Sequence, residues 1–420
     1  SPPSHSETHR PHAEPARPAS PNPSPAAAPV PPSPSPALAS PAQQPPSAPS
    51  PLTLRGSENS TDADLDIDRS RMQHIYTFCK GYVQQCATKG MRPSSCAARL
   101  RNYGPCTALR AGNFGMGLRC ESPTGPLVMK VVLLEKDNLN TVRNSAKEVL
   151  IGCQASALKL HGVLDLFAEV YDFLWCAPGD AVAFLSSVDL SNVSSTEMTQ
   201  ASVRGLVRTA RSHKVSSTFM LLGMVAVPDS PSKPFLGYAD PTMVFEIFYT
   251  IITFNYVLDY CMTDMRTHHV GTKQVPFHRH YEVLGTDVLL PPGRMVKFID
   301  MGSYRTRHHP NPTAKAVLTL SYYFTMWVTD QQLDPEAREL WYWSQRPDVV
   351  DLPPLQALRK FAAHFVGRFP QFAGSPRAKW RGVRNVRHYR VPSAAEAREV
   401  ATTYHNVYDY HWQVMPVSTT

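Results

Sequence analysis

The sequence predicts a bilobal α+β protein, with a small lobe made mostly of strands and a larger helical lobe, behind a disordered tail. Three observations support this prediction. Residues 1–68 are dominated by Pro, Ser and Ala, and almost no large apolar side chain is present to offset the entropy cost of ordering. Residues 107–190 contain short apolar runs between turn residues, which indicates strands. Residues 191–374 contain mostly longer runs with helical spacing.

The small lobe is expected to be mostly sheet with one helix. The runs CTALRAGNFGMGLRCES and GPLVMKVVLLE flank glycine-containing turns, which predicts antiparallel hairpins. The run NTVRNSAKEVLIGCQASALKL has apolar residues at helical spacing and predicts a helix. The runs AEVYDFLWC and AVAFLSSVDL lie on either side of Ala-Pro-Gly-Asp, a typical turn sequence, so they predict a further hairpin over residues 168–190.

The larger lobe is expected to be helical apart from one hairpin. Its predicted helices are SVRGLVRTARSHK, MVFEIFYTIITFNYVLDY, KAVLTLSYYFTMWV, DPEARELWYWSQ and LQALRKFAAHFVGRF. The second of these, residues 243–260, contains Glu246, Asn255 and Asp259, so it predicts a buried helix rather than a membrane span. The exception is TDVLLPPGRMVKFID, where two strands over residues 286–299 are expected to pair across the turn PPGR.

Cysteines and sequons favour the secretory pathway. Five of the eight cysteines fall early in the chain without the paired spacing of a zinc module, which favours a disulfide-linked segment before the small lobe, over residues 69–106. The sequons at Asn59 and Asn192 are compatible with a secreted glycoprotein. Because the chain begins at Ser1 rather than Met, the sequence is compatible with a leader or a membrane anchor ahead of it.

The net charge of +8 is modest, and part of it lies in the run SPRAKWRGVRNVRHYR, at the start of a basic C-terminal extension over residues 375–420. Such runs are usually a solvated face, so nucleic acid is not an expected partner.

Two motifs of the small lobe point to phosphate chemistry. Gly112 and Gly115, on either side of the turn that holds Phe114, would let a hairpin close over a polyphosphate without a Cβ in the way. Lys130 ends an apolar run, and a buried lysine needs an anionic partner, which Glu148 on the following helix can supply.

Two acidic residues of the larger lobe complete the pattern. Asp264 in YCMTDMRTHHVG could accept the proton of an attacking hydroxyl, while Arg266 could neutralise the transferring phosphate. Asp300, at the end of the strand MVKFI, could hold a divalent metal ion against phosphate oxygens. Asp264 and Asp300 are expected to face one cleft between the lobes.

With these motifs in this order, residues 75–370 resemble the protein-kinase-like fold, in particular the divergent protein kinase domain family of the secretory pathway, in which a cysteine-rich segment precedes the kinase domain. The resemblance implies that the glycine hairpin covers ATP and that Lys130 and Glu148 hold its phosphates. It also implies Asp264 as the catalytic base, Asp300 in Asp-Met-Gly as a ligand of Mg²⁺ or Mn²⁺, and a protein or glycan hydroxyl as the acceptor.

Two alternatives remain. His269 stands where the family has a metal-binding Asn, and the segment after Asp300 is short, which favours a pseudokinase that serves as a binding module. If His269 does bind a metal, imidazole favours Mn²⁺ over Mg²⁺. The other alternative is a nucleic-acid-binding adaptor that uses the basic run. The remaining histidines, among them His278 and His280, are expected to be surface residues rather than a separate metal site.

Overall fold

A computed structural model gives the fold of the protein. It describes residues 70–82, 94–112, 115–123, 125–134, 139–188, 205, 208, 218–225, 239–262, 269–299, 301, 305–306, 313–320, 333–374 and 385–405. All of these belong to one compact unit, Leu52–Thr420, and they form a mixture of helices and sheets, as predicted. The predicted tail, both sequons and nearly all of the helix predicted over residues 202–214 lie outside the described residues.

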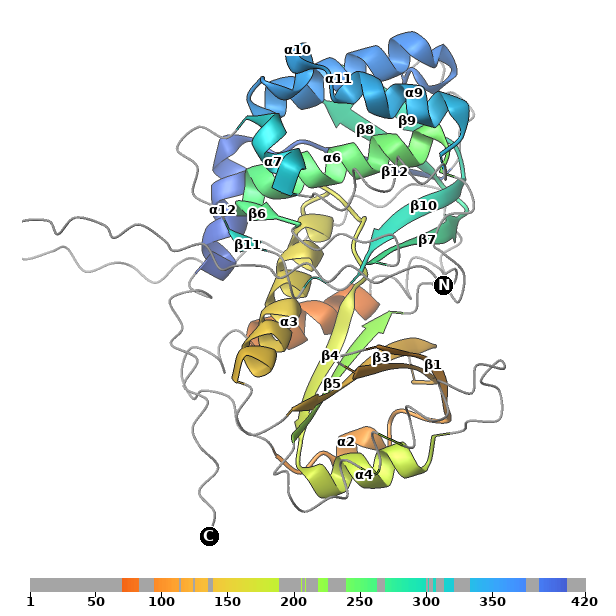
Figure 1. Ribbon diagram of the computed structural model, residues 1–420, viewed down its shortest axis with the longest axis vertical. Helices are drawn as coiled ribbons and strands as arrows, with labels where there is room; N and C mark the ends of the chain where they lie inside the picture. Colours follow the sequence, from red (N-terminus) through yellow and green to blue (C-terminus); the bar gives the residue numbers. More distant parts are fainter. Residues whose placement is uncertain are drawn as a thin grey trace, which may run out of the picture. The chain divides into compact units, whose positions relative to one another are not determined.

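The first half of the described chain is built on a five-stranded antiparallel sheet with the order β1-β2-β3-β5-β4 (Figure 1). The strands are β1 (Cys106–Gly112), β2 (Gly115–Cys120), β3 (Leu127–Leu134), β4 (Val170–Cys176) and β5 (Thr218–Val225). The two predicted hairpins over residues 106–134 are confirmed. Because β5 follows residue 190, the sheet extends beyond the boundary expected for the small lobe.

Helix α3 (Leu139–Leu160) joins β3 to β4 and contacts β4, and the sequence predicted this helix to within one residue. Its buried face includes Val149, Leu150 and Ile151, which are fully buried. A helix over residues 70–82 and the short helix α2 (Ala97–Leu100) precede the sheet.

The hairpin predicted around Ala-Pro-Gly-Asp is wrong, because helix α4 (Pro178–Ser186) follows β4 directly. Pro178 occupies the first turn, where its missing N–H is not needed, and Asp180 in the same turn favours a helix N-terminus. The carboxylate of Asp180 also accepts a 2.7 Å hydrogen bond from the backbone N–H of Cys96. The turn sequence was therefore the beginning of a helix.

The second half is organised around α6 (Pro241–Leu258), which is the predicted buried helix. Asp240 caps it by accepting hydrogen bonds from the N–H groups of Thr242 and Met243. Four further helices contact α6 (Figure 1), and they are α7 (Ala314–Leu320), α9 (Pro335–Ser344), α11 (Pro354–Arg368) and α12 (Ala394–His405). The short helices α10 (Pro347–Val350) and η3 (Pro370–Phe372) flank α11. Among the described helices, α6 alone is long and apolar enough to cross a membrane, and 89% of that segment is buried inside the protein.

This half contains more strands than the sequence predicted. The strands are β6 (Tyr260–Cys261), β7 (Val270–Val275), β8 (His278–Val283), β9 (Thr286–Leu290), β10 (Gly293–Phe298), β11 (Arg305–Thr306) and β12 (Val386–Arg390). The predicted pairing of β9 with β10 is wrong, because β9 pairs with β8 and β10 pairs with β7. The tight turn lies instead at Leu284-Gly285, where both residues have positive φ, as a two-residue hairpin loop requires.

Strand β12 comes from the basic C-terminal run and pairs parallel with β8. Val386 and Tyr389 are buried, while Arg390 forms an ion pair with Glu396 of α12. These residues of the expected extension over 375–420 are therefore part of the folded unit. The basic residues of the run before Asn385 lie outside the described residues.

A buried ion pair connects α6 to the strands. Glu246, fully buried, accepts hydrogen bonds from Arg279 Nε at 2.7 Å, from the Tyr281 hydroxyl at 2.9 Å and from the Val296 N–H at 3.0 Å. Arg279 donates its other N–H groups to backbone carbonyls. Glu246, which led us to predict a buried helix rather than a membrane span, is thus paired with Arg279 inside the protein, as a buried carboxylate requires.

Three disulfides are present among the described cysteines, and they fit an extracellular or secretory-pathway location. Only Cys106–Cys120 closes within the early cysteine-rich region. The other two, Cys79–Cys153 and Cys96–Cys176, tie that region to α3 and to the end of β4. Four of the five early cysteines are thus disulfide-bonded, as expected of a disulfide-linked segment, although two of their partners lie further along the chain, and Cys261 is buried.

Candidate functional site

The predicted pairing of Lys130 with Glu148 is confirmed. Lys130 lies on β3, and its Nζ is 2.8 Å from Oε2 of Glu148 on α3. The Glu148 side chain is 3% exposed, whereas that of Lys130 is 26% exposed. A carboxylate buried this deeply requires a cationic partner, and the half-buried lysine retains an accessible side from which to meet an anion. The pair can therefore hold a phosphate while Glu148 fixes the lysine.

The glycine pair lies at the end of the hairpin, as predicted. Gly112 and Gly115 are opposite each other in the β1–β2 register, and Cys106–Cys120 links the other end of the hairpin. Gly117 is opposite Lys130 in the β2–β3 register, so the hairpin runs alongside the lysine. Phe114 lies outside the described residues.

Asp264, Arg266 and Asp300 also lie outside the described residues, but hydrogen bonds define the chain on either side of them. Cys261 of β6 is opposite Arg305 of β11. The backbone N–H of Ile299 donates to the carbonyl of His269 at 2.7 Å. These two pairings hold together the described residues that flank the segments 263–268 and 300–304.

The side chain of the residue after Asp300 lies near the helix that carries Glu148. A Cβ placed on Gly152 of α3 would lie 3.6 Å from Cε of Met301. Gly152 is one helical turn after Glu148, so Met301 lies close to the turn that positions the ion pair. Met301 is the described residue of the Asp-Met-Gly motif, and it lies near the helix that carries Glu148.

His269, the predicted metal ligand, is buried at the start of β7. Among the described residues, no group of three or more His, Cys, Asp or Glu side chains could hold a metal ion. Metal binding by Asp300 and His269 therefore stays a prediction.

The prediction that His280 lies on the surface is wrong. His280, expected on the surface, is buried on β8, where its Nε2 is 2.9 Å from Asp287 and its Nδ1 is 3.0 Å from Nδ1 of His388. Burial lowers the pKa of both imidazoles.

A buried charge cluster was missed by the sequence analysis. Asp165, between α3 and β4, accepts a 2.8 Å hydrogen bond from Lys297 of β10, and Lys159 and Arg387 lie 3.5 Å from its carboxylate. Although burial opposes ionisation, these three cations hold the pKa of Asp165 well below its usual range. Lys159 also contacts Glu169. The position of Lys297 within an apolar strand could have predicted this cluster, since a buried lysine implies a carboxylate partner.

A cavity lies elsewhere, beside the edge strand β4, and none of the described site residues lines it. No known family model and no curated protein matches this chain. The kinase-like resemblance therefore remains a prediction from the motifs, supported by the contacts described above.

Proposed function

We propose that this protein is a secretory-pathway phosphotransferase of the protein-kinase-like class, which transfers the γ-phosphate of ATP to a hydroxyl of a protein or glycan acceptor. The observation that carries the proposal is the ion pair between Lys130 and Glu148, at 2.8 Å between the third strand of the sheet and the following helix. A strand lysine held by a helix glutamate is the arrangement that positions ATP phosphates in protein kinases.

Further contacts support the same proposal. The glycine hairpin runs beside Lys130, where it could cover the nucleotide. Met301 lies near Gly152 of α3, which supports the proposal that Asp300 would hold Mg²⁺ or Mn²⁺ against the phosphates. Asp264 would accept the proton of the attacking hydroxyl, and Arg266 would neutralise charge on the transferring phosphate.

The test is nucleotide binding, measured as a thermal shift with ATP alone, with ATP and Mg²⁺, and with ATP and Mn²⁺. Saturating ATP at about 100 times its dissociation constant should stabilise the protein by about 2.7 kcal/mol. Lys130→Met and Glu148→Gln should abolish most of this shift. Lys360→Met is the matched control, because Lys360 makes a 2.7 Å ion pair with Asp348 on the exposed surface. The proposal fails if ATP shifts the wild type and Lys130→Met equally.

A nucleotide-binding pseudokinase is the second candidate, and His269 favours it because imidazole is a poor ligand for Mg²⁺. ATP binding that is equally strong with and without metal, together with no phosphate transfer or ATP hydrolysis, would support the pseudokinase. Metal-dependent binding that is lost in Asp300→Asn would support the transferase.

A further inference from the structure

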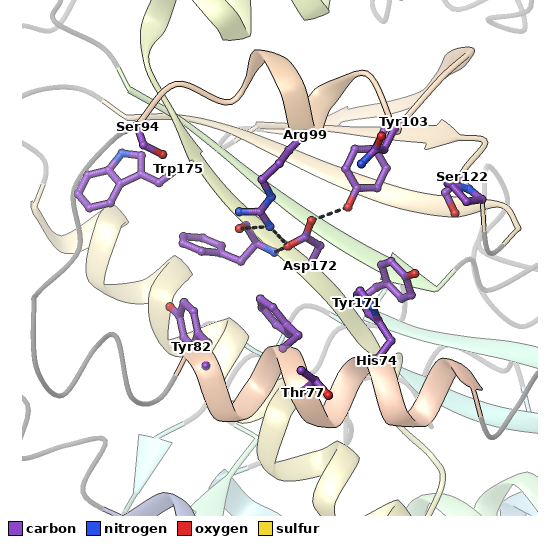
Figure 2. Close-up of a pocket in the computed structure, with 15 residues that line it drawn as sticks. His74, Thr77, Tyr82, Ser94, Arg99, Tyr103, Ser122, Tyr171, Asp172 and Trp175 are labelled. Carbon is purple, nitrogen blue, oxygen red and sulfur yellow. Dashed lines mark hydrogen bonds and ion pairs between the residues drawn. The ribbon is translucent and has the colours of Figure 1, made fainter.

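The cavity beside β4 has a volume of about 590 Å³, which is within the range of small-molecule sites. Figure 2 shows the helix over residues 70–82 on one side of it, the segment from Ser94 to Tyr103 on the other, and β4 between them. The disulfides Cys79–Cys153 and Cys96–Cys176 fix these two walls to α3 and β4. The cavity is therefore built from parts that are covalently held, so little ordering is needed when a ligand binds.

Several aromatic side chains line the cavity among polar ones. The aromatic side chains that line it are Phe78, Tyr82, Tyr103, Tyr171, Phe173 and Trp175. The exposed imidazole of His74 stacks on Tyr171 with 4.2 Å between ring centroids, and the rings of Tyr82 and Phe173 meet edge to face at 5.3 Å. The other aromatic side chains are buried, so Phe78 and His74 are the rings that can offer a face to the C–H groups of a ligand.

The charges in the cavity are already balanced. Arg99 and Asp172 form an ion pair near its centre (Figure 2). Asp172 also accepts hydrogen bonds from the Tyr103 hydroxyl at 2.5 Å and from the Phe173 N–H at 2.7 Å. Its capacity to accept is largely used, and the positive charge of Arg99 is neutralised. A charged ligand therefore gains little here compared with water.

The cavity still presents neutral hydrogen-bonding groups. Asn102, Thr77 and Ser94 are exposed and line the cavity. Nε and Nη1 of Arg99 have no hydrogen-bond partner within the described part of the chain, and its side chain is 54% exposed. The exposed groups thus include N–H donors and both donor and acceptor atoms of hydroxyls and an amide.

From this combination we infer that the cavity beside β4 is a binding site for a neutral saccharide, separate from the proposed nucleotide site. A sugar ring presents a face of C–H groups and an edge of hydroxyls, each able to donate and to accept, so the face packs on aromatic rings while the hydroxyls reach planar polar groups. The disulfides place the protein in the compartment where such glycans are attached to proteins.

The experiment uses the full, oxidised chain and ligand-observed NMR. The probes are methyl glycosides of glucose, galactose, mannose, xylose, N-acetylglucosamine and N-acetylgalactosamine, with lactose and cellobiose, each up to about 50 mM, since monovalent sugars in open pockets typically bind at millimolar concentrations. Inorganic phosphate and sulfate are the charged probes. At least one sugar should bind, and more strongly than either anion.

Matched variants locate the binding. Phe78→Ala and Asn102→Ala each remove a group that lines the cavity, and each should weaken sugar binding at least tenfold. Gln73→Ala is the control, because Gln73 is exposed on the same helix and does not line the cavity. Lys130→Met should bind the sugar as the wild type does, even if it loses ATP, so the two proposals can fail separately.

Three results would overturn the inference. One is that no sugar binds at the highest concentration. Another is that phosphate or sulfate binds more strongly than every sugar and is lost in Arg99→Gln, which would make the cavity an anion site. The last is that sugar binding survives both Phe78→Ala and Asn102→Ala, which would place it outside the cavity.

Discussion

Gly152→Ala tests whether close packing of α3 on β4 holds the candidate site together. A Cβ on Gly152 would lie 2.1 Å from Cγ2 and 3.0 Å from Cβ of Val170. Ordinary carbon–carbon contacts are about 3.5 Å or longer, so the helix or the strand must move by about 1.4 Å. Overpacking of this size costs about 3 kcal/mol, while Ala gains about 1 kcal/mol over Gly in helix propensity. The net loss of stability is about 2 kcal/mol.

Thermal unfolding measures this loss, and at roughly 2–4 °C per kcal/mol the melting temperature should fall by about 4–8 °C. Gly367→Ala is the matched control, because Gly367 lies in α11 with nothing within 4 Å of an added Cβ. There the same substitution should raise stability by about 0.5–1 kcal/mol. Val170→Ala should partly rescue Gly152→Ala, because it removes the methyl group with the shortest contact.

The functional consequence follows from the position of Glu148 one turn before Gly152 on the same helix. A shift of α3 would lengthen the 2.8 Å contact with Lys130, so Gly152→Ala should weaken ATP binding as well as stability. The reasoning is refuted if Gly152→Ala stabilises the protein as Gly367→Ala does. It is also refuted if ATP affinity is unchanged although the helix has been destabilised.

Three further predictions concern the rest of the fold. Glu246→Gln should cost about 3–5 kcal/mol in urea unfolding, because it leaves a buried arginine without its counter-charge, and an unchanged midpoint would contradict the ion pair as described. Burial lowers the pKa of His280 and His388 below 6.5, so the unfolded imidazoles take up protons first. This contribution to stability is complete above about pH 6.5 and declines as the pH falls through the folded pKa values. The melting temperature should therefore be lower at pH 5.5 than at pH 7.5, and a flatter dependence is expected in His388→Gln, whereas an identical slope in that variant would argue against this source. Cys153→Ser removes a link between residues 74 apart in sequence and should cost about 2–4 kcal/mol, and Cys106→Ser, which opens a link across 14 residues, should cost less in the same thermal assay. The reverse order would show that the length of the closed loop does not decide the effect.

The sequence predicted local features well where one pattern had one physical solution. The hairpins over residues 106–134 follow from apolar runs between glycine turns, and α3 follows from its spacing. The Lys130–Glu148 pair was predictable because a lysine in an apolar strand requires an anion, and the next helix supplied a glutamate.

Predictions failed where pairing depended on distant residues. Both β9 and β10 are strands, as expected, but their partners are β8 and β7, and the turn sequence between them did not determine the pairing. Ala-Pro-Gly-Asp suits both a hairpin turn and a helix start, and the contact of Asp180 with the distant Cys96 N–H accompanies the helix. The disulfide pairing could not be predicted from the sequence either, because two of the links join cysteines 74 and 80 residues apart.

Two of the disulfides bear directly on the candidate site, because each is attached to an element that forms or supports it. Cys106–Cys120 links the hairpin that ends in the two glycines. Cys79–Cys153 joins the helix over residues 70–82 to α3, next to Gly152 and five positions beyond Glu148. A helix held both by a covalent link and by close packing against β4 has little freedom to move away from the sheet. The Lys130–Glu148 pair should therefore be formed before any nucleotide arrives, so that binding does not have to offset the cost of assembling it.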